Sequence, residues 1–219
     1  MWETLTFTTV EGTAAHTHMF WRERHVGERL RPWLRTGNTV LDLGAGRGRI
    51  SMWLRDNVGV RPTLSDVMVR RGLRVELPFI LQEDPFTVPV EDNSFDHVMI
   101  LFVLHHIADR HDQERLIAEP IRIAKQSILI LEDTPESPFS RLSAKVLDWL
   151  FNRPFGVPTP FSFRTRADWC DTLERMGLVL RFVGSHRVLW PSLNAFPNTL
   201  FVAEVGHAWR QGGSAEVLS

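Results

Sequence analysis

The segment Val40–Gly48, with the sequence VLDLGAGRG, constrains the fold of this chain more than any other stretch. A run of apolar residues enters a glycine-rich turn, and the pattern after the turn is helical. Glycine tolerates positive φ and lets a ligand approach the backbone closely, while the first turn of a helix offers unpaired N–H groups. The segment therefore predicts a strand over Thr39–Leu43, a helix from about Arg47 to Asp56, and a ligand site over the turn between them.

Strands and helices are predicted to alternate along the chain, which is the order of a mostly parallel sheet covered by helices. The second strand ends near Ser65 and contains Pro62, so we expect it to be short or irregular. The nearly continuous apolar run at 97–102 predicts a strand that is buried on both faces. The remaining elements are strands at 79–81, 127–131, 178–183 and 200–205, and helices at 67–73 and 112–123.

The chain is expected to form a single domain over residues 1–206, with a flexible tail at 207–219. A helix is predicted at 18–35, and residues 134–165 are predicted to be a helical and aromatic lid insertion. Within the insertion, the apolar residues at 139, 142, 146 and 150 share one face, so 138–151 should be an amphipathic helix. Thr165 and Asp168 are spaced as a capping box for the helix that follows.

Composition narrows the classes of function. The formal net charge is −1 and the pI is about 6.8, so the chain has no overall excess of basic residues and a nucleic-acid partner is disfavoured, although a balanced total leaves room for a local basic patch. Cys170 is the only cysteine, which excludes an internal disulfide and a multi-cysteine metal site. We predict no metal site, no membrane span, no signal peptide and a cytoplasmic location; the oligomeric state stays open.

The chemistry of the turn indicates which ligand it holds. The Gly-Lys-Ser/Thr pattern of a phosphate loop is missing, and the G-x-G-x-G spacing differs from the G-x-G-x-x-G of dinucleotide sites. Asp42 would repel a pyrophosphate, whereas a ligand with a cationic end suits it. Asp66, about twenty residues further on, can accept both hydroxyls of a ribose; the alternative is that it caps the following helix. A nucleoside with a positive end, such as S-adenosylmethionine (SAM), fits both carboxylates.

Three segments resemble class I SAM-dependent methyltransferases of the type 11-like kind. Residues 40–48 resemble the first motif of that family. Residues 83–96, EDPFTVPVEDNSFD, are similar to its G-D-A-x-x-L-P-F-x-D-x-S-F-D stretch, with Glu83 in place of glycine and Pro85 in place of alanine. Residues 98–107, VMILFVLHHI, resemble the end of its fourth strand. The resemblance covers roughly residues 36–133, with a weaker tail to 206, and implies a doubly wound, Rossmann-like α/β fold. Its sheet would have seven mostly parallel strands, the last antiparallel, with helices on both faces.

The resemblance also implies roles for individual residues in binding SAM. The methionine end of SAM would lie against the bend, which contains Asp42, Gly44, Ala45, Gly46 and Gly48. Asp66, followed by Val67, would hold the ribose. Asp84, Pro85 and Phe86 would surround the adenine, although Pro85 has no N–H to donate. Phe102 would lie in the same crevice, while Asp92 and Asp96 are expected to serve a turn and a strand entry.

His105 and His106 are the candidate catalytic bases, and at most one of them should face the crevice. The alternative is that one packs under the sheet and the other caps a turn. Glu132 and Asp133, at the end of the fifth buried strand, are either structural or in contact with substrate. The aromatic residues of the insertion would line a pocket for a small, partly apolar acceptor or would be core: Phe139, Trp149, Phe155 and Phe161.

The predicted function is therefore methyl transfer from SAM to a small molecule. Two rivals from other classes stay open at this stage: a SAM-binding regulatory or partner protein without catalysis, and a nicotinamide-dependent oxidoreductase.

Overall fold

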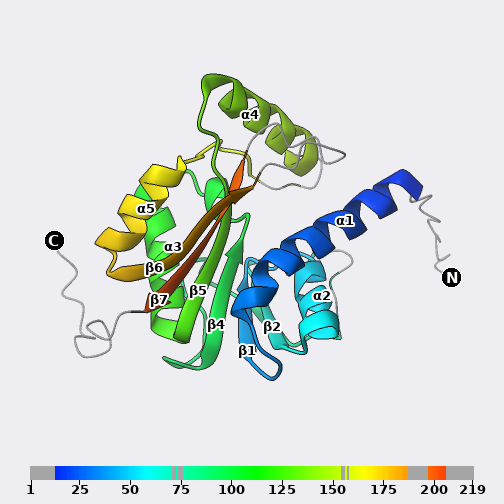
Figure 1. The fold of residues 1–219 in the computed structure, drawn as a ribbon, viewed down its shortest axis with the longest axis vertical. Coiled ribbons are helices and arrows are strands. Elements are labelled where there is room, and N and C mark those ends of the chain that lie inside the picture. The colour runs from blue at the N-terminus through cyan, green and yellow to red at the C-terminus, as the bar shows by residue number, and fades with distance from the viewer. Residues whose placement is uncertain are drawn as a thin grey trace, which may run out of the picture.

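The sheet of this protein has seven strands in the order β3-β2-β1-β4-β5-β7-β6 (Figure 1). The structure is a computed structural model, which describes residues 13–70, 73, 76–153, 156, 158–186 and 197–205. The strands are β1 (Thr39–Leu43), β2 (Arg61–Asp66), β3 (Phe79–Leu81), β4 (Phe95–Leu101), β5 (Ala124–Asp133), β6 (Leu178–His186) and β7 (Asn198–Val205). All seven predicted strands are present; β1 and β3 have the predicted bounds, and the others have ends that differ by a few residues.

The five strands from β1 to β5 are parallel, and β7 runs antiparallel to both of its neighbours. The predicted mostly parallel sheet with an antiparallel last strand is confirmed. The order of the strands reverses between β1 and β4, which are adjacent in space. In sheets of this kind, ligands bind beyond the carboxyl ends of the strands at such a reversal.

The expectation that Pro62 shortens or distorts β2 is wrong. Pro62 pairs in register with Val40, and β2 is a regular strand of six residues. Arg61 donates its N–H to Asn38 on the β1 side, so the nitrogen of Pro62 faces the opposite edge. Since β3 pairs only with Leu64–Asp66, no hydrogen bond of the ladder is lost at Pro62.

Helices cover both faces of the sheet. One face is covered by α1 (Thr13–Leu30) and α2 (Arg49–Val58), and the other by α3 (Arg110–Ile123) and α5 (Arg166–Arg175). Alternate residues of β4 feed the two cores: Met99 packs with the α1 and α2 side, and Ile100 with the α3 and α5 side. The period of two along a doubly covered strand explains its continuous apolar sequence.

The insertion contains α4 (Pro138–Asn152), which lies beyond the carboxyl end of β5 and apart from the helices that cover the sheet (Figure 1). Its N-cap, Ser137, forms a capping box with Ser140. The predicted capping box of Thr165 and Asp168 at the start of α5 is also present. Both boxes satisfy backbone groups at a helix start, so these two helices begin where the local sequence dictates.

Some boundaries differ from the sequence-based predictions. The predicted helix at 67–73 is wrong for its described part, because residues 67–70 and Leu73 are not helical. The N-terminal helix begins earlier than predicted, at Thr13, and continues as a short 3₁₀ turn over Arg31–Trp33. The predicted tail at 207–219 lies outside the described residues. None of the described helices has an apolar stretch long enough to cross a bilayer.

Candidate cofactor and acceptor site

The glycine bend between β1 and α2 uses three glycines with positive φ for different reasons. Gly44, Gly46 and Gly48 have φ values of 74°, 59° and 69°. A Cβ on Gly44 would lie 2.6 Å from Val103, and one on Gly48 would lie 2.4 Å from Leu64, so both positions are packed against side chains. A Cβ on Gly46 would meet no atom within 4 Å. Gly46 therefore presents bare backbone to open space, as a site for a ligand requires.

Asp66 lies at the carboxyl end of β2, directly beside the bend. Its carboxylate is 5% exposed and accepts the N–H of Gly46 at 2.9 Å and the N–H of Met68 at 3.2 Å. It therefore holds the bend and caps a turn rather than a helix. A carboxylate can accept about four hydrogen bonds, so these two N–H groups leave capacity for the hydroxyls of a ribose.

Asp42 lies beneath the bend and is 3% exposed. Its carboxylate accepts a hydrogen bond from the hydroxyl of Ser51 at 2.6 Å. Burial, with a smaller contribution from the charge of Asp66, raises the pKa of Asp42 to about 7 against the opposing effect of the Ser51 hydrogen bond. A buried carboxylate in this state gains from a positive charge nearby. The two carboxylates of Asp42 and Asp66 therefore fit a cationic nucleoside and would disfavour an anionic one.

The predicted adenine loop follows β3. Asp84 is exposed and accepts the N–H of Phe86 at 3.0 Å and the hydroxyl of Thr87 at 3.1 Å. The hydrogen bond from Phe86 is the main reason that the pKa of Asp84 is lowered. The guanidinium of Arg115 lies 4.2 Å from the ring centre of Phe86. Buried Gln82 donates to the carbonyl of Pro85 at 3.5 Å. The loop is thus ordered by its own side chains.

Phe102 marks the turn that follows β4. Its φ is +59°, which is unusual for a bulky residue. Its N–H donates to the carbonyl of Leu131 at 2.8 Å, and the guanidinium of Arg22 lies 4.7 Å from its ring centre. Strained backbone of this kind gathers at functional turns. Val103, the next residue, packs against Gly44, so this turn joins the glycine bend to the histidine pair.

The carboxylate of Glu132, at the end of β5, organises the histidine pair. Glu132 is fully buried, and one of its oxygens accepts the N–H groups of Val103 at 2.8 Å and Leu104 at 2.7 Å. Its other oxygen lies 2.7 Å from Nδ1 of His105. Of the two roles left open for Glu132, the structure shows the structural one: its carboxylate holds Val103, Leu104 and His105 in the turn after β4.

His105 and His106 differ in their charge. Burial alone would lower the pKa of His105, but the charge and hydrogen bond of Glu132, with the charges of Asp133 and Asp148, raise it to about 9. His105 is therefore an imidazolium at neutral pH. Burial, and then the charge of His105, lower the pKa of His106, so His106 is neutral. Its Nδ1 lies 2.8 Å from the carbonyl of Pro158.

Asp148, on α4, completes a group that we call the histidine cluster: Glu132, His105, His106 and Asp148. One carboxylate oxygen of Asp148 lies 3.9 Å from Nε2 of His105 and 4.0 Å from Nδ1 of His106. Of the described residues, His105, His106 and Asp148 offer ligand atoms within 4.8 Å of one another, close enough for a metal ion. The contact of Glu132 with Nδ1 of His105 and the nearby carboxylate of Asp148 form an ion-pair network around this imidazole.

The aromatic residues predicted to line a pocket are dispersed. Phe139 and Trp149 lie on the outer side of α4 and are 73% and 47% exposed, so neither forms a pocket wall in this structure. Phe161 is half-buried and packs with Ala144 and Phe163. Phe155 lies outside the described residues. The sequence indicated an aromatic segment, but only packing decides which rings face inward.

Three residues of the site escaped the sequence analysis: Ser51, Gln82 and Asp148. Each is polar and buried. Asp148 carried a signal, because it is the only acidic residue of α4 and lies off the predicted apolar face. Its partners are more than forty residues away in sequence, so spacing alone could not find them.

Comparison with known proteins agrees with this geometry. Residues 41–130 match the family model described as a methyltransferase domain. Over these residues the chain is similar to class I SAM-dependent methyltransferase domains. The match contains the glycine bend, Asp66, the adenine loop and the histidine pair. SAM is the cofactor of this family, and the carboxylates beneath the bend fit its positive charge.

Individual relatives of the methyltransferase domain are distant. A ubiquinone/menaquinone biosynthesis C-methyltransferase, UbiE, of Stenotrophomonas maltophilia is 28% identical over 123 residues, or 50% of this chain and 47% of that protein. The UbiE protein of Xylella fastidiosa is 25% identical over 177 residues, covering 75% and 62%. The chain thus spans about half to three fifths of the curated relatives that it matches. The magnesium protoporphyrin IX methyltransferase of Synechocystis PCC 6803, solved with bound SAH, has a TM-score of 0.63 at 18% identity, covering 89% of this chain and 88% of that one. That likeness concerns the fold.

Proposed function

We propose that this protein transfers the methyl group of SAM to a small, partly apolar acceptor. The observation that carries the proposal is the open glycine bend at Gly46, set beside the buried carboxylates of Asp42 and Asp66. The sulfonium of SAM is already activated, so the protein mainly has to hold an acceptor in line with the methyl group and exclude water.

The binding residues are those of the bend and its neighbours. Asp66 would accept the ribose hydroxyls while it holds Gly46, and Asp42 would face the positive end. Exposed Val67, with the Asp84–Phe86 loop, would cover the adenine. The Pro85 carbonyl is occupied by Gln82, Pro85 has no N–H, and the N–H groups of Phe86, Thr87 and Val88 are donated within the protein. We therefore assign recognition of adenine to side chains.

Of the two histidines, His106 is the candidate base. The carbonyl of Pro158 can only accept, so the single proton of a neutral His106 lies on Nδ1, and Nε2 keeps a lone pair. His105 already carries its second proton and cannot take another. We therefore assign His106 the removal of a proton from the acceptor, and His105 the positioning of His106, since their ring centres lie 4.1 Å apart.

The class of acceptor follows from two supporting observations. The curated relatives are named for methylation of carbon in quinone biosynthesis, and such acceptors are aromatic and apolar. The buried ring of Phe163 stacks on His105 with ring centres 5.2 Å apart, so the surroundings of the histidine pair are apolar and aromatic. An enol or phenol ring, whose proton a neutral imidazole can remove, suits both features.

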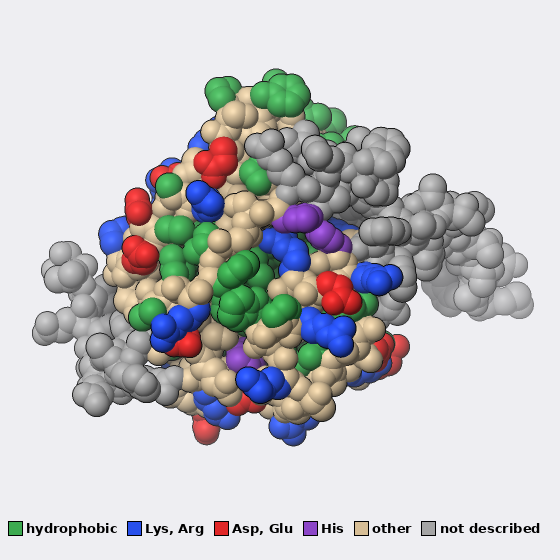
Figure 2. Space-filling view, in the orientation of Figure 1, with side chains coloured by type: hydrophobic (Ala, Val, Ile, Leu, Met, Phe, Trp, Pro, Cys, Tyr) green, Lys and Arg blue, Asp and Glu red, His purple; other side chains and the backbone are tan. Residues whose placement is uncertain are grey.

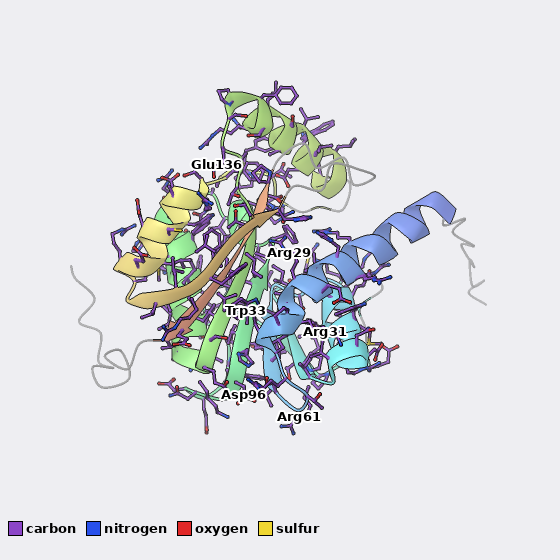
Figure 3. All side chains as sticks on the ribbon, viewed as in Figure 1. Arg29, Arg31, Trp33, Arg61, Asp96 and Glu136 are labelled. Atoms are coloured by element: carbon purple, nitrogen blue, oxygen red, sulfur yellow. The ribbon has the colours of Figure 1, made fainter. Side chains whose placement is uncertain are left out.

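The test is transfer of labelled methyl groups from SAM to a panel of phenols, quinols and enolic ketones. We expect His106→Gln to lower kcat by about a hundredfold with an unchanged Kd for SAM. Asp66→Asn should weaken SAM binding by about tenfold or more. The matched control is Asp96→Asn, because Asp96 accepts the N–H of Thr39 at the opposite end of the sheet (Figure 3) and should leave both quantities unchanged.

A binding protein without catalysis would give a different pattern. SAM would bind to the wild-type protein and lose affinity in Asp66→Asn, while no acceptor in the panel, and none in a cell extract, became labelled. That result would contradict methyl transfer and leave the cofactor site standing.

A further inference from the structure

The helix α4 is inverted relative to an ordinary surface helix. Its inward side is made of small and polar residues, since Ser140, Ala144 and Asp148 are buried. The large apolar residues point to solvent and form what we call the outer stripe: Phe139, Leu142, Val146, Trp149 and Leu150, with exposed fractions of 73%, 62%, 54%, 47% and 51%. Figure 2 shows apolar side chains gathered at this tip of the molecule. The hydrophobic effect would bury such a face in an isolated domain.

The outer stripe is continuous along the helix. Phe139, Leu142 and Val146 follow one another at spacings of three or four residues, and Trp149 and Leu150 lie three and four residues beyond Val146, so all five share one face. The helix is also preformed, because the capping box of Ser137 and Ser140 fixes its start. A preformed apolar face of about three turns, whose members are each 47% or more exposed, has the form of a docking surface.

The charges of α4 indicate what the outer stripe contacts. Arg141 and Lys145 are exposed on one flank of the stripe, one turn apart, and exposed Arg153 lies at its end, with its guanidinium 5.7 Å from the ring centre of Trp149. Asp148 is the only acidic residue of the helix, and it is buried against the histidine cluster. The exposed surface of α4 therefore combines apolar residues with positive charge only.

We propose that α4 docks the protein on the surface of an anionic lipid bilayer. An amphipathic helix with aromatic and aliphatic residues on one face and Lys or Arg beside them lies in the plane of the interface, with its apolar face among the acyl chains. Phe139 and Leu142 enter the bilayer, and Arg141 and Lys145 contact the anionic headgroups. A second copy of the chain fits the stripe less well, because pairing two α4 helices would bring their like charges together.

The position of α4 determines which end of the protein would face the bilayer. Asp148, on the inward side of the helix, contacts His105 and His106, so the bilayer would lie over the carboxyl end of the sheet. An acceptor dissolved in the membrane would then reach the site without crossing water. The docking itself does not depend on methyl transfer, and the experiment below uses no SAM.

The experiment is co-sedimentation of the full chain with vesicles of phosphatidylcholine alone, or with 30% phosphatidylglycerol added, at about 0.1 M salt. We expect the anionic vesicles to bind the protein at least tenfold more tightly. The double variant Leu142→Gln/Val146→Gln should lose this binding. Lys145→Glu should weaken it about fivefold or more, because each cation near an anionic surface contributes about that factor.

Matched controls separate the helix from the general surface. Val179→Gln changes an apolar residue on β6 that is 46% exposed, and Arg31→Glu changes an exposed cation on the other side of the molecule from α4 (Figure 3). Both should bind vesicles as the wild type does, and all variants should keep the circular dichroism of the wild type. Equal binding of the wild type to both vesicles would overturn the proposal. So would a dimer in sedimentation velocity that the double variant abolishes while vesicle binding is absent.

Discussion

Replacing Asp42 by asparagine should stabilise the protein without ligand and weaken its binding of SAM. The reason is the cost of keeping this buried carboxylate ionised. The pKa of Asp42 is about 7, against 3.8 for an exposed aspartate. At about 1.4 kcal/mol for each pH unit, an ionised Asp42 costs the folded state roughly 4 kcal/mol.

The sign follows from where the proton is held. Between pH 3.8 and pH 7 the folded state keeps a proton on Asp42 that the unfolded chain has already released. Stability therefore falls as the pH rises through this window and is level above it. More than half of this loss falls between pH 5 and pH 8. Asparagine does not ionise, and its side-chain oxygen can still accept the hydrogen bond of Ser51.

The assay is unfolding by urea, followed by circular dichroism, at pH 5, 6.5 and 8. The free energy of unfolding of Asp42→Asn should exceed that of the wild type by an amount that grows by about 2 kcal/mol over this range, once relaxation around the charge is allowed for. Isothermal titration at pH 8 should show SAM affinity reduced by about tenfold, since a contact to a charged group contributes about 1.5–3 kcal/mol. A stability difference that is independent of pH, or a variant less stable than wild type at pH 8, would refute the reasoning.

Two further predictions concern the same end of the sheet. The pKa of His105 is raised to about 9, so its protonated ring stabilises the fold fully below about pH 6.5. This contribution, about 3 kcal/mol in all, is lost as the pH rises through 9. His105→Gln should flatten the stability profile between pH 6.5 and 9, and an imidazole NMR signal titrating near 6.5 would contradict the ion-pair network. Gly48→Ala should lower the free energy of unfolding by about 2–3 kcal/mol, because its methyl group would strike Leu64 in a left-handed backbone. Gly46→Ala has the same backbone strain without the clash, so it should cost only about 1 kcal/mol of stability. It should also raise the Kd for SAM by tenfold or more. If Gly46→Ala unfolded at a lower temperature than Gly48→Ala, the open crevice at Gly46 would be contradicted.

Short-range patterns in the sequence were sufficient for much of the fold. The strand at Thr39–Leu43 was predicted with its observed bounds, and the capping box of Thr165 and Asp168 placed the start of α5 correctly. These features depend on neighbouring residues, as do the positive φ values of the glycine bend. The helix predicted at 67–73 is absent from the described part of that range, where the carboxylate of Asp66 holds Gly46 and a turn at Met68.

The residues of the candidate site also divide into those that the sequence indicated and those that only the structure revealed. Motifs in the sequence identified the glycine bend, Asp66 and the histidine pair, because a ligand needs those residue types close together along the chain. The sequence could not assign the charges of the two histidines, since Glu132 lies 27 residues from His105 and Asp148 lies further still. The pKa values of His105 and Asp42 depend on burial and on partners that only the folded chain brings into contact.

The helix α4 shows where the division lies. Its sequence alone determined that residues 138–151 form a helix with one apolar stripe, because periodicity is a local property of the chain. Only the tertiary structure decided that the stripe faces outward, since Asp148 is held against the histidine pair and turns the opposite face of the helix toward the sheet. The apolar pattern of a helix depends on residues that are close together in the sequence, whereas the burial of each side chain depends on which distant segments pack against it.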